Sequence, residues 1–452
     1  MHGSGSVVGW LARNSVAAFM VYGAGAALTY CSQLMIARLA GADAYGIYAY
    51  VFAWMTVLAY VSALGFDVSL LRFVPGYRVA QAWALLRGVI RYAERRTLTV
   101  GGGVALVGVL LVMMLGRRFP PQLTVTFIIG FVLVPVWARL WIRCAVVRAF
   151  GGVVSALGPD RVVRDGLLLV LVAAAGWGMG WKLGAPFAML ATVLSSGVGL
   201  ALVSLAVRRR RPGAVAAAVP EYARATWRRT AMPLVLIAVG ETLMNRTGVL
   251  LLGCIGHTRD AGIYALAFNI AFVVVLPRTA VNALLAPMIS ELYIRNDRAG
   301  LQALITKTTS WTLLSVACMA VPLWFVAGDI LARFGHDFAG GTLTLRVLLI
   351  GQVVAAGAGS QLFIMTMTGH ERSAAVRLLL SAIANAVLSA ALIQPAGLVG
   401  AAVAATATLI LWNYAMSLFI WRRLRLLPGA LAMLRLPFEQ GGHFRPPFGA
   451  AE

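Results

Sequence analysis

The sequence predicts an all-α polytopic membrane protein with twelve transmembrane helices in two six-helix lobes. Composition is the first observation behind this fold class, because the 452 residues are 61% hydrophobic and only 12% charged, against about 45–50% and about 25% in soluble domains. The second is a series of apolar stretches near the length of about 20 residues that crosses a bilayer. The third is an internal repeat with an offset of 216 residues.

The apolar stretches define the predicted spans. They cover residues 15–37, 47–71, 97–115, 122–143, 166–181, 186–207, 231–254, 262–288, 309–327, 343–368, 376–394 and 397–421. The first stretch is too long for the hydrophobic region of a cleaved signal peptide, so we expect it to remain as the first helix. The fifth contains Gly176, Gly178 and Gly180, and we expect a tilted or irregular helix there.

The positive charges predict the orientation of these spans. The net charge is +23, which in a soluble protein would suggest a nucleic-acid partner. Here 29 of the 38 basic residues lie in connections on the N-terminal side of the membrane, 7 lie on the opposite side, and Arg246 and Arg278 lie inside spans. This is the positive-inside distribution of a membrane protein. It predicts a multi-pass inner-membrane protein with both termini in the cytoplasm and no nucleic-acid partner.

The internal repeat predicts two halves. Gly-Ile-Tyr-Ala at 46–49 recurs at 262–265, Gly-Ala at 184–185 recurs at 400–401, and Ala-Thr at 191–192 recurs at 407–408. Because each half has an even number of spans, both halves insert with the same orientation, and a pseudo-two-fold axis along the membrane normal should relate them. The predicted domains are an N-terminal lobe over 1–207, a cytoplasmic linker over 208–229, a C-terminal lobe over 230–421 and a cytoplasmic tail over 422–452.

No cofactor or metal is expected. The four cysteines contain no Cys-x-x-Cys pair and lie within or beside apolar runs, so we interpret them as packing residues. The sequence contains no Walker A pattern and no span-free stretch long enough for a nucleotide-binding domain. A transporter without ATPase activity would draw on an H+ gradient, a Na+ gradient or the membrane potential.

Several short motifs resemble those of the polysaccharide transporter family. They are ARLAGADAYGIY at 37–48, LGF at 64–66, RFV at 72–74, GIYALA at 262–267, TGHER at 368–372 and GLVGAA at 397–402. Members of this family are the oligosaccharide flippases, O-antigen flippases among them, of the multidrug/oligosaccharidyl-lipid/polysaccharide (MOP) exporter superfamily. The resemblance extends from about residue 15 to about residue 421.

The resemblance implies a MATE-like arrangement of two six-helix bundles around a central cavity. It also implies a function: moving an undecaprenyl-diphosphate-linked oligosaccharide to the periplasmic leaflet by alternating access, for lipopolysaccharide or other polysaccharide biosynthesis. The implied partners are the lipid-linked oligosaccharide, membrane lipids and polysaccharide assembly proteins. The chain would then be a transporter and not an enzyme.

Ionisable residues inside spans are the candidate transport residues, because burying a charge in a membrane is costly. Glu241, Asn245 and Arg246 lie on the seventh span, with Glu241 about 15 Å from its cytoplasmic end. Arg278 lies at a similar depth on the eighth span, so we expect that it can pair with Glu241. The alternative is a neutralised pair that only holds the two helices together.

Three further charged residues lie near span ends. Asp67 and Arg72 lie at the cytoplasmic end of the second span, where a side chain can reach the interface at little cost. Arg38 lies at the periplasmic edge, beside the repeated motif, and is interpreted as either a gate or an interface residue. All three are retained as candidates for the transport path.

Other functions remain open from sequence. A MATE-type drug/cation antiporter would share the twelve spans, but it needs carboxylates in its cavity, and the predicted spans hold Asp67 and Glu241 against Arg246 and Arg278. A membrane-embedded glycan polymerase or ligase would need a large periplasmic loop, whereas the connections here are short. A lipid II flippase of the same superfamily typically has fourteen spans.

Overall fold

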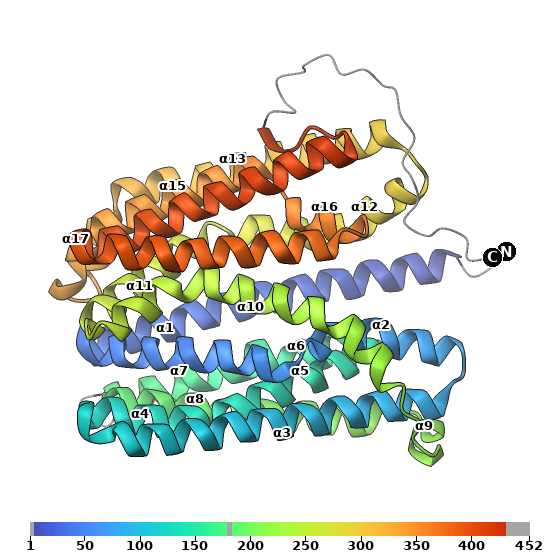
Figure 1. Ribbon diagram of the computed structural model, residues 1–452, viewed down its shortest axis with the longest axis horizontal. Helices are drawn as coiled ribbons and strands as arrows, with labels where there is room; N and C mark the ends of the chain where they lie inside the picture. The colour runs from blue at the N-terminus through green and yellow to red at the C-terminus, as the bar shows by residue number, and fades with distance from the viewer. Residues whose placement is uncertain (1–3, 179–182, 431–452) are drawn as a thin grey trace. The chain divides into compact units, whose positions relative to one another are not determined.

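In a computed structural model, described over residues 4–178 and 183–430, the chain is built from helices and has no strand in those ranges (Figure 1). The first helices are α1 (Ser4–Ala63), α2 (Phe66–Val79), α3 (Trp83–Leu115), η1 (Gly116–Arg118), α4 (Pro121–Phe131), α5 (Leu133–Ala149), α6 (Val153–Leu157), η2 (Gly158–Val163), α7 (Arg164–Ala173), η3 (Ala174–Gly178), α8 (Ala185–Arg210) and α9 (Gly213–Ala217). They are followed by α10 (Arg224–Cys254), α11 (Thr258–Val273), α12 (Leu276–Ile294), α13 (Arg298–Phe325), α14 (Ala327–Ala332), η4 (His336–Gly341), α15 (Thr342–Ala358), α16 (Gln361–Met367), α17 (Glu371–Phe419) and η5 (Ile420–Leu424).

The helices form two compact units. Unit 1 comprises Met1–Thr242 with His257–Gly262, and unit 2 comprises Leu243–Gly256 with Ile263–Glu452. The division falls inside α10, so this one helix contributes residues to both units. The predicted cytoplasmic linker, 208–229, lies wholly within unit 1.

Eight helical segments in the described part of the chain are long and apolar enough to cross a membrane. Two of them, Gly23–Val79 and Glu371–Leu424, have 57 and 54 residues, which is enough for two crossings each. Each contains one glycine with non-helical backbone angles: Gly41 has φ 77° and ψ 174°, and Gly397 has φ 52° and ψ −129°. These glycines separate the first predicted span from the second and the eleventh from the twelfth.

The two remaining predicted spans are interrupted helices. The fifth consists of α6, η2, α7 and η3, of which η2 and η3 are π-helical. This confirms the predicted irregularity at Gly176 and Gly178, while Gly180 lies outside the described residues. The eighth consists of α11 and α12, which are separated at residues 274–275. The break in this span lies just before Pro277, the second residue of α12.

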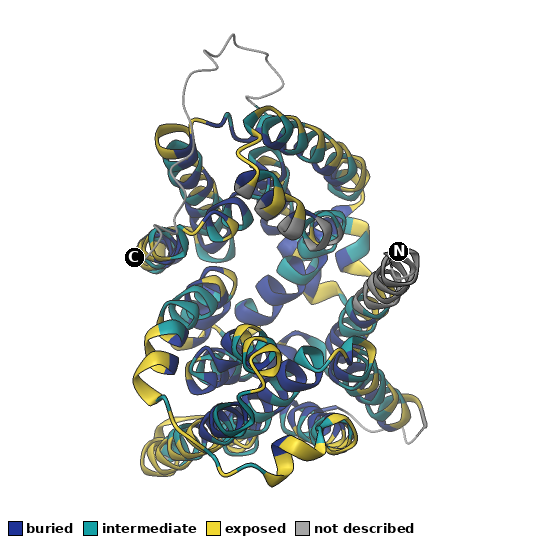
Figure 2. Ribbon diagram, turned by 90° about the vertical axis from the view of Figure 1, so that its right-hand side faces the viewer, coloured by how far each residue is buried: buried dark blue, intermediate teal, exposed yellow. Residues whose placement is uncertain are grey.

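The core of unit 1 depends on close helix contacts at the repeated glycines. A Cβ atom placed on Gly46 would lie 1.8 Å from the backbone oxygen of Thr258, and one on Gly262 would lie 2.8 Å from the Cα of Gly46. Gly46 and Gly262 therefore pack backbone against backbone within unit 1. Tyr48, two residues after Gly46, is fully buried. Figure 2 shows buried and exposed residues on opposite sides of the same helices.

The four cysteines were expected to be packing residues in the interior of the protein, and only one of them is buried. Cys144 is buried in α5, whereas Cys31, Cys254 and Cys318 are exposed on the surface of the protein. Their neighbours in the sequence are apolar, and a surface that faces lipid is apolar as well. Position in an apolar run therefore could not distinguish core from lipid-facing cysteines.

Candidate functional site

Unit 1 contains a buried cluster of charges where η2 meets α7. The guanidinium of Arg164 contacts Asp165 with 2.8 Å between Nε and Oδ1, and contacts Asp160 with 3.2 Å between Nη1 and Oδ1. The side chains of Arg164, Asp160 and Asp165 are 14%, 7% and 6% exposed. Arg161 lies 3.4 Å from Asp160 and is 45% exposed. The hydroxyl of Thr29 on α1 donates a hydrogen bond to Asp165.

The π-helical turn explains why these side chains meet. In a regular α-helix, residues five apart, such as Asp160 and Asp165, point about 140° away from each other. The wider π turn over Gly158–Val163 reduces this angle, so both carboxylates reach Arg164. Gly25 allows α1 to approach, since a Cβ on Gly25 would lie 2.5 Å from the Cβ of Arg161. Single π turns inside α-helices are frequent at functional sites.

A chain of polar side chains lies beside this cluster. One helical turn after Thr29, the amide of Gln33 donates to the Tyr48 hydroxyl over 3.3 Å and accepts from the Tyr45 hydroxyl over 3.3 Å. The Tyr48 and Thr192 hydroxyls are 3.2 Å apart. All four side chains are buried. The core of unit 1 therefore has a hydrogen-bonded polar group in addition to the charge cluster, within a membrane protein, where buried polar groups are costly.

Unit 2 has a smaller polar group at the second copy of the Ala-Thr repeat. The Thr408 hydroxyl lies 3.0 Å from Oδ1 of Asn385, and Nδ2 of Asn385 donates to the carbonyl of Met244 on α10 over 3.3 Å. Asn385 and Thr408 are buried. This group carries no charge, so the two units differ in the chemistry of their cores.

The predicted residues on α10 are arranged as expected from helix geometry. Glu241 and Asn245 are both exposed and four residues apart, and Arg246 is half-buried. Glu241 belongs to unit 1, whereas Asn245, Arg246 and Arg278 belong to unit 2. The predicted pairing of Glu241 with Arg278 therefore stays a prediction.

Arg278 and Asp67 occupy similar positions in two interrupted helices. Arg278 is half-buried in the first turn of α12, directly after the break at 274–275. Asp67 is half-buried in the first turn of α2, directly after Gly65, which adopts φ 69°. Both breaks follow a Gly-Ile-Tyr-Ala motif along the chain. The first turn after the break thus carries a negative charge in unit 1 and a positive charge in unit 2.

The other two candidates lie on surfaces. Arg72 is exposed on α2, and Arg38 is exposed one turn before Gly41. Neither belongs to the charge cluster at η2 and α7. Arg38 lies beside the residues that carry the repeated motif, as predicted.

Sequence reasoning missed Asp160, Arg164 and Asp165. They directly precede the predicted fifth span at 166–181. The sequence therefore assigned Arg161 and Arg164 to a cytoplasmic connection between spans. The structure instead places them in a helix that begins at Val153. The available signal was the Asp-x-x-x-Arg spacing of Asp160 and Arg164 after Pro159, because an acid and an arginine four residues apart can pair along a helix.

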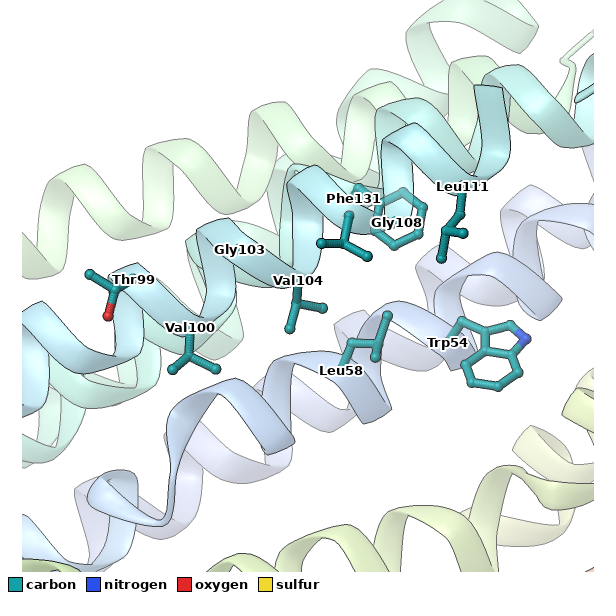
Figure 3. A pocket seen from close by; sticks show the side chains of 10 residues that line it. Trp54, Leu58, Thr99, Val100, Gly103, Val104, Gly108, Leu111 and Phe131 are labelled. Carbon is teal, nitrogen blue, oxygen red and sulfur yellow. The ribbon is translucent and has the colours of Figure 1, made fainter. Parts of the chain in front are cut away.

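Unit 1 also has an apolar groove among α1, α3 and α4 (Figure 3). Its volume is about 480 Å³. Trp54 and Leu58 on α1 lie opposite Val104 and Leu111 on α3, and the ring of Phe131 on α4 closes one side. The groove holds none of the charged candidates.

Solved structures resemble this chain over nearly its whole length. No model of a protein family matches the sequence, and no curated protein matches it. The inward-facing conformation of a multidrug resistance MATE family transporter of the MOP superfamily matches with TM-score 0.72 and 14% identity, over 91% of this chain and 96% of that chain. The outward-facing conformation of such a transporter matches with TM-score 0.62 and 12% identity, over 92% and 94%.

A MATE transporter of Vibrio cholerae matches with TM-score 0.55 and 15% identity, over 91% of this chain and 98% of that chain. Identities at this level establish a fold. They confirm the predicted fold class. The chain is an all-α polytopic membrane protein with the fold of the MATE transporters of the MOP superfamily.

Proposed function

We propose that this protein is a flippase that moves an undecaprenyl-diphosphate-linked oligosaccharide across the bacterial inner membrane by alternating access. Polysaccharide biosynthesis, including that of lipopolysaccharide, would use its product. The proposal is supported by the MOP fold and by the short motifs at 37–48 and 262–267 that resemble the polysaccharide transporter family. We further propose that both termini are cytoplasmic and that no bond is made or broken, so the protein is not an enzyme.

The observation that carries this proposal is the pair of half-buried arginines within the predicted seventh and eighth spans, Arg246 on α10 and Arg278 on α12. Arg278 lies in the first turn of a helix that begins inside a predicted span. The amide groups of a helix N-terminus favour anions, and half-helix starts point at anionic substrate groups in other transporters. Two guanidiniums can each meet phosphate oxygens bidentately, which lysine does less well. A diphosphate is the cargo group that suits this chemistry.

Asn245 and Glu241 complete the proposed path. Asn245 is exposed one residue before Arg246 and offers an amide for sugar hydroxyls. A carboxylate at Glu241 can compete with phosphate for an arginine, which would allow the head group to leave.

Complementation of a bacterial strain that lacks its flippase tests this function through surface glycan. We expect the wild-type chain to restore glycan, and Arg246→Ala and Arg278→Ala each to abolish it at normal levels of inserted protein. Lysine at either position should restore export partly. Arg208→Ala, at an exposed position near the end of α8, is the matched control. Wild-type export by both alanine variants would contradict the proposed role of the arginines.

A MATE-type drug/cation antiporter is the second candidate. The solved structures that share the fold include multidrug resistance transporters, and the buried carboxylates Asp160 and Asp165 are groups that can exchange cations. Dye efflux from cells that express the chain distinguishes the two candidates. Efflux that depends on Asp165, without restored surface glycan, would favour the antiporter.

Energy coupling is proposed to reside in the Asp160–Arg164–Asp165 cluster. Two carboxylates share one guanidinium there, so the binding of a proton or Na+ at one carboxylate would release Arg164 to the other. Asp165→Asn should therefore leave the protein folded but make transport independent of the ion gradient. Proteoliposomes with an imposed H+ or Na+ gradient would measure this change.

A further inference from the structure

Three arginines of unit 1, Arg87, Arg91 and Arg211, gather beside α9 and are called the arginine cluster below. Arg87 on α3 donates a hydrogen bond to the carbonyl of Ala218, the residue that caps α9. Nη2 of Arg211 donates to the carbonyl of Val215 over 3.1 Å. The two carbonyls are three residues apart, about 4.5 Å along a helix, so the two guanidiniums lie close together.

Arg91 joins them from α3. It follows Arg87 by four residues, so both side chains lie on the same face of that helix. Arg91 is half-buried and forms no hydrogen bond or ion pair within the part of the chain that the structure describes. Burial and the charges of Arg87 and Arg91 lower the pKa of Arg211, as expected for three neighbouring guanidiniums.

The backbone beside the arginine cluster is held in place. A Cβ atom on Gly88 of α3 would lie 1.7 Å from the carbonyl oxygen of Glu221, so this glycine lets the segment after α9 rest directly on α3. The amide of Glu221 also donates to the carbonyl of Ala84 over 3.1 Å. The arginines from α3 and from the end of α8 are therefore fixed relative to each other.

The arginine cluster forms no ion pair among the described residues. The carboxylate whose charge acts on Arg211 is Glu94, and it is already paired with Arg143, 3.0 Å from Nε. The Nε atoms of Arg87 and Arg211 are buried and have no hydrogen-bond partner in the same ranges. Like charges that are partly withdrawn from water repel each other. A bound anion would offset this repulsion.

Capping of α9 is the alternative role for these side chains, because arginines can hydrogen-bond the last carbonyls of a helix. Capping accounts for Arg87 and Arg211, which bond the carbonyls of Ala218 and Val215. It does not account for Arg91, which bonds no carbonyl and adds a third positive charge. Arg91 is therefore the member that indicates a ligand.

We propose that the arginine cluster binds a phosphate group. Guanidiniums meet phosphate oxygens bidentately, so three of them can surround one phosphate. The cluster lies just outside the predicted spans 97–115 and 186–207, on the side that the basic residues predict to be cytoplasmic. An anionic lipid head group and a phosphate in solution offer the same chemistry there. The site lies outside the proposed transport path, so it does not depend on the cargo.

Two binding measurements on the purified full chain distinguish the sources of the phosphate. Native mass spectrometry in detergent would count bound dioleoyl phosphatidylglycerol, with dioleoyl phosphatidylcholine as the reference that has the same acyl chains and no net charge. In phosphatidylcholine nanodiscs, inorganic phosphate should raise the melting temperature if it binds the folded chain, with sodium chloride at equal ionic strength as the reference. We expect at least one of the two ligands to bind.

Arg91→Gln should weaken binding of that ligand about tenfold, as expected for the loss of a charge-assisted contact. Arg91→Lys keeps the charge and should weaken it less. Neither variant removes a hydrogen bond to α9, so the segment should stay docked. Arg229→Gln is the matched control, because Arg229 is exposed on α10 within 208–229 and its loss changes the net charge equally.

A dependence on Arg91 for phosphatidylglycerol alone would identify a lipid site, and one for inorganic phosphate alone would identify a site for a soluble ligand. Three results would overturn the proposal. They are no binding of either ligand to wild type, equal binding to wild type and Arg91→Gln, and an equal loss in Arg229→Gln, which would mean that only the total charge matters. None of these results bears on the proposed flippase function, which surface glycan tests separately.

Discussion

The charge cluster of unit 1 shows how much depends on single side chains in a membrane core. Arg164 contacts both Asp160 and Asp165, and all three side chains are largely withdrawn from solvent. Removing Arg164 would take the guanidinium from both carboxylates, and only Asp160 would keep an arginine contact, to the half-exposed Arg161. Breaking a buried ion pair in this way costs more than the intact pair contributes to stability.

Arg164→Ala should lower the free energy of unfolding by about 3–5 kcal/mol, the range measured for broken buried ion pairs. Thermal unfolding of the purified protein in detergent would show this as a lower melting temperature. Arg161→Ala is the control, since Arg161 contacts Asp160 but is 45% exposed, and about 0–1 kcal/mol is expected. Equal melting temperatures for the two variants would contradict the central position of Arg164.

Gly46 is a second position where a single added atom, the Cβ of any other residue, should destabilise the protein. In Gly46→Ala the new Cβ would lie 1.8 Å from the Thr258 oxygen, a backbone atom that cannot move without its helix. We expect a loss of stability of roughly 1–3 kcal/mol or more. In Gly102→Ala no atom lies within 4 Å of the new Cβ, so alanine should be neutral or stabilising by about 1 kcal/mol. Melting temperatures in detergent would compare the two, and similar values would refute the close contact.

Elements at one end of unit 1 pack around the start of α10. Trp227 is fully buried, contacts Tyr92 and donates from Nε1 to the Tyr77 hydroxyl over 2.9 Å. The segment before it is also attached to α3, because Arg87 donates to the carbonyl of Ala218 and the Glu221 amide donates to the carbonyl of Ala84 over 3.1 Å. Burial and the neighbouring Arg87 and Arg91 lower the pKa of Arg211. The stretch 211–227 is therefore a docked element of unit 1.

Trp227→Ala should detach this element, at a cost of about 3–5 kcal/mol for a buried tryptophan. Limited proteolysis with an arginine-specific protease should then cut between residues 211 and 229 faster than in wild type. Trp311→Ala serves as control, because Trp311 is 61% exposed on α13. Unchanged cleavage in Trp227→Ala would mean that the segment does not depend on this contact.

Hydropathy located the helices but not their interruptions. The predicted spans follow the apolar runs, since length and composition determine which helices can cross a bilayer. The breaks at Leu64–Gly65 and at 274–275 do not interrupt those runs, so hydropathy could not detect them. Likewise, α3 begins at Trp83 and not near residue 97, because a helix can continue into water where the sequence is charged. The π turn at Gly158–Val163, and with it the charge cluster, had no hydropathy signal.

At the scale of the whole molecule, composition and the apolar runs predicted the all-α, multi-span fold class that the structure has. The two copies of the repeat show parallel local features: Thr192 and Thr408 are both buried and both donate to the carbonyl four residues before. The charged residues differ between the halves, however, since unit 1 contains the Asp160–Arg164–Asp165 cluster. The two units therefore share local structure at the repeat but differ in where they carry buried charge.

The orientation in the membrane is the last prediction. Both termini and the 208–229 segment should be cytoplasmic, because the predicted spans leave 29 basic residues on that side against 7 on the other, and each basic residue near an anionic leaflet contributes about 1 kcal/mol. Reporters that fluoresce only after export, fused after residues 213 and 425, should stay dark. A fusion after residue 257, in the connection between α10 and α11, should be bright. Fluorescence of the fusion at 213 or 425 would show that this part of the chain is periplasmic. The predicted topology, and the proposed side from which the cargo is taken, would then be wrong.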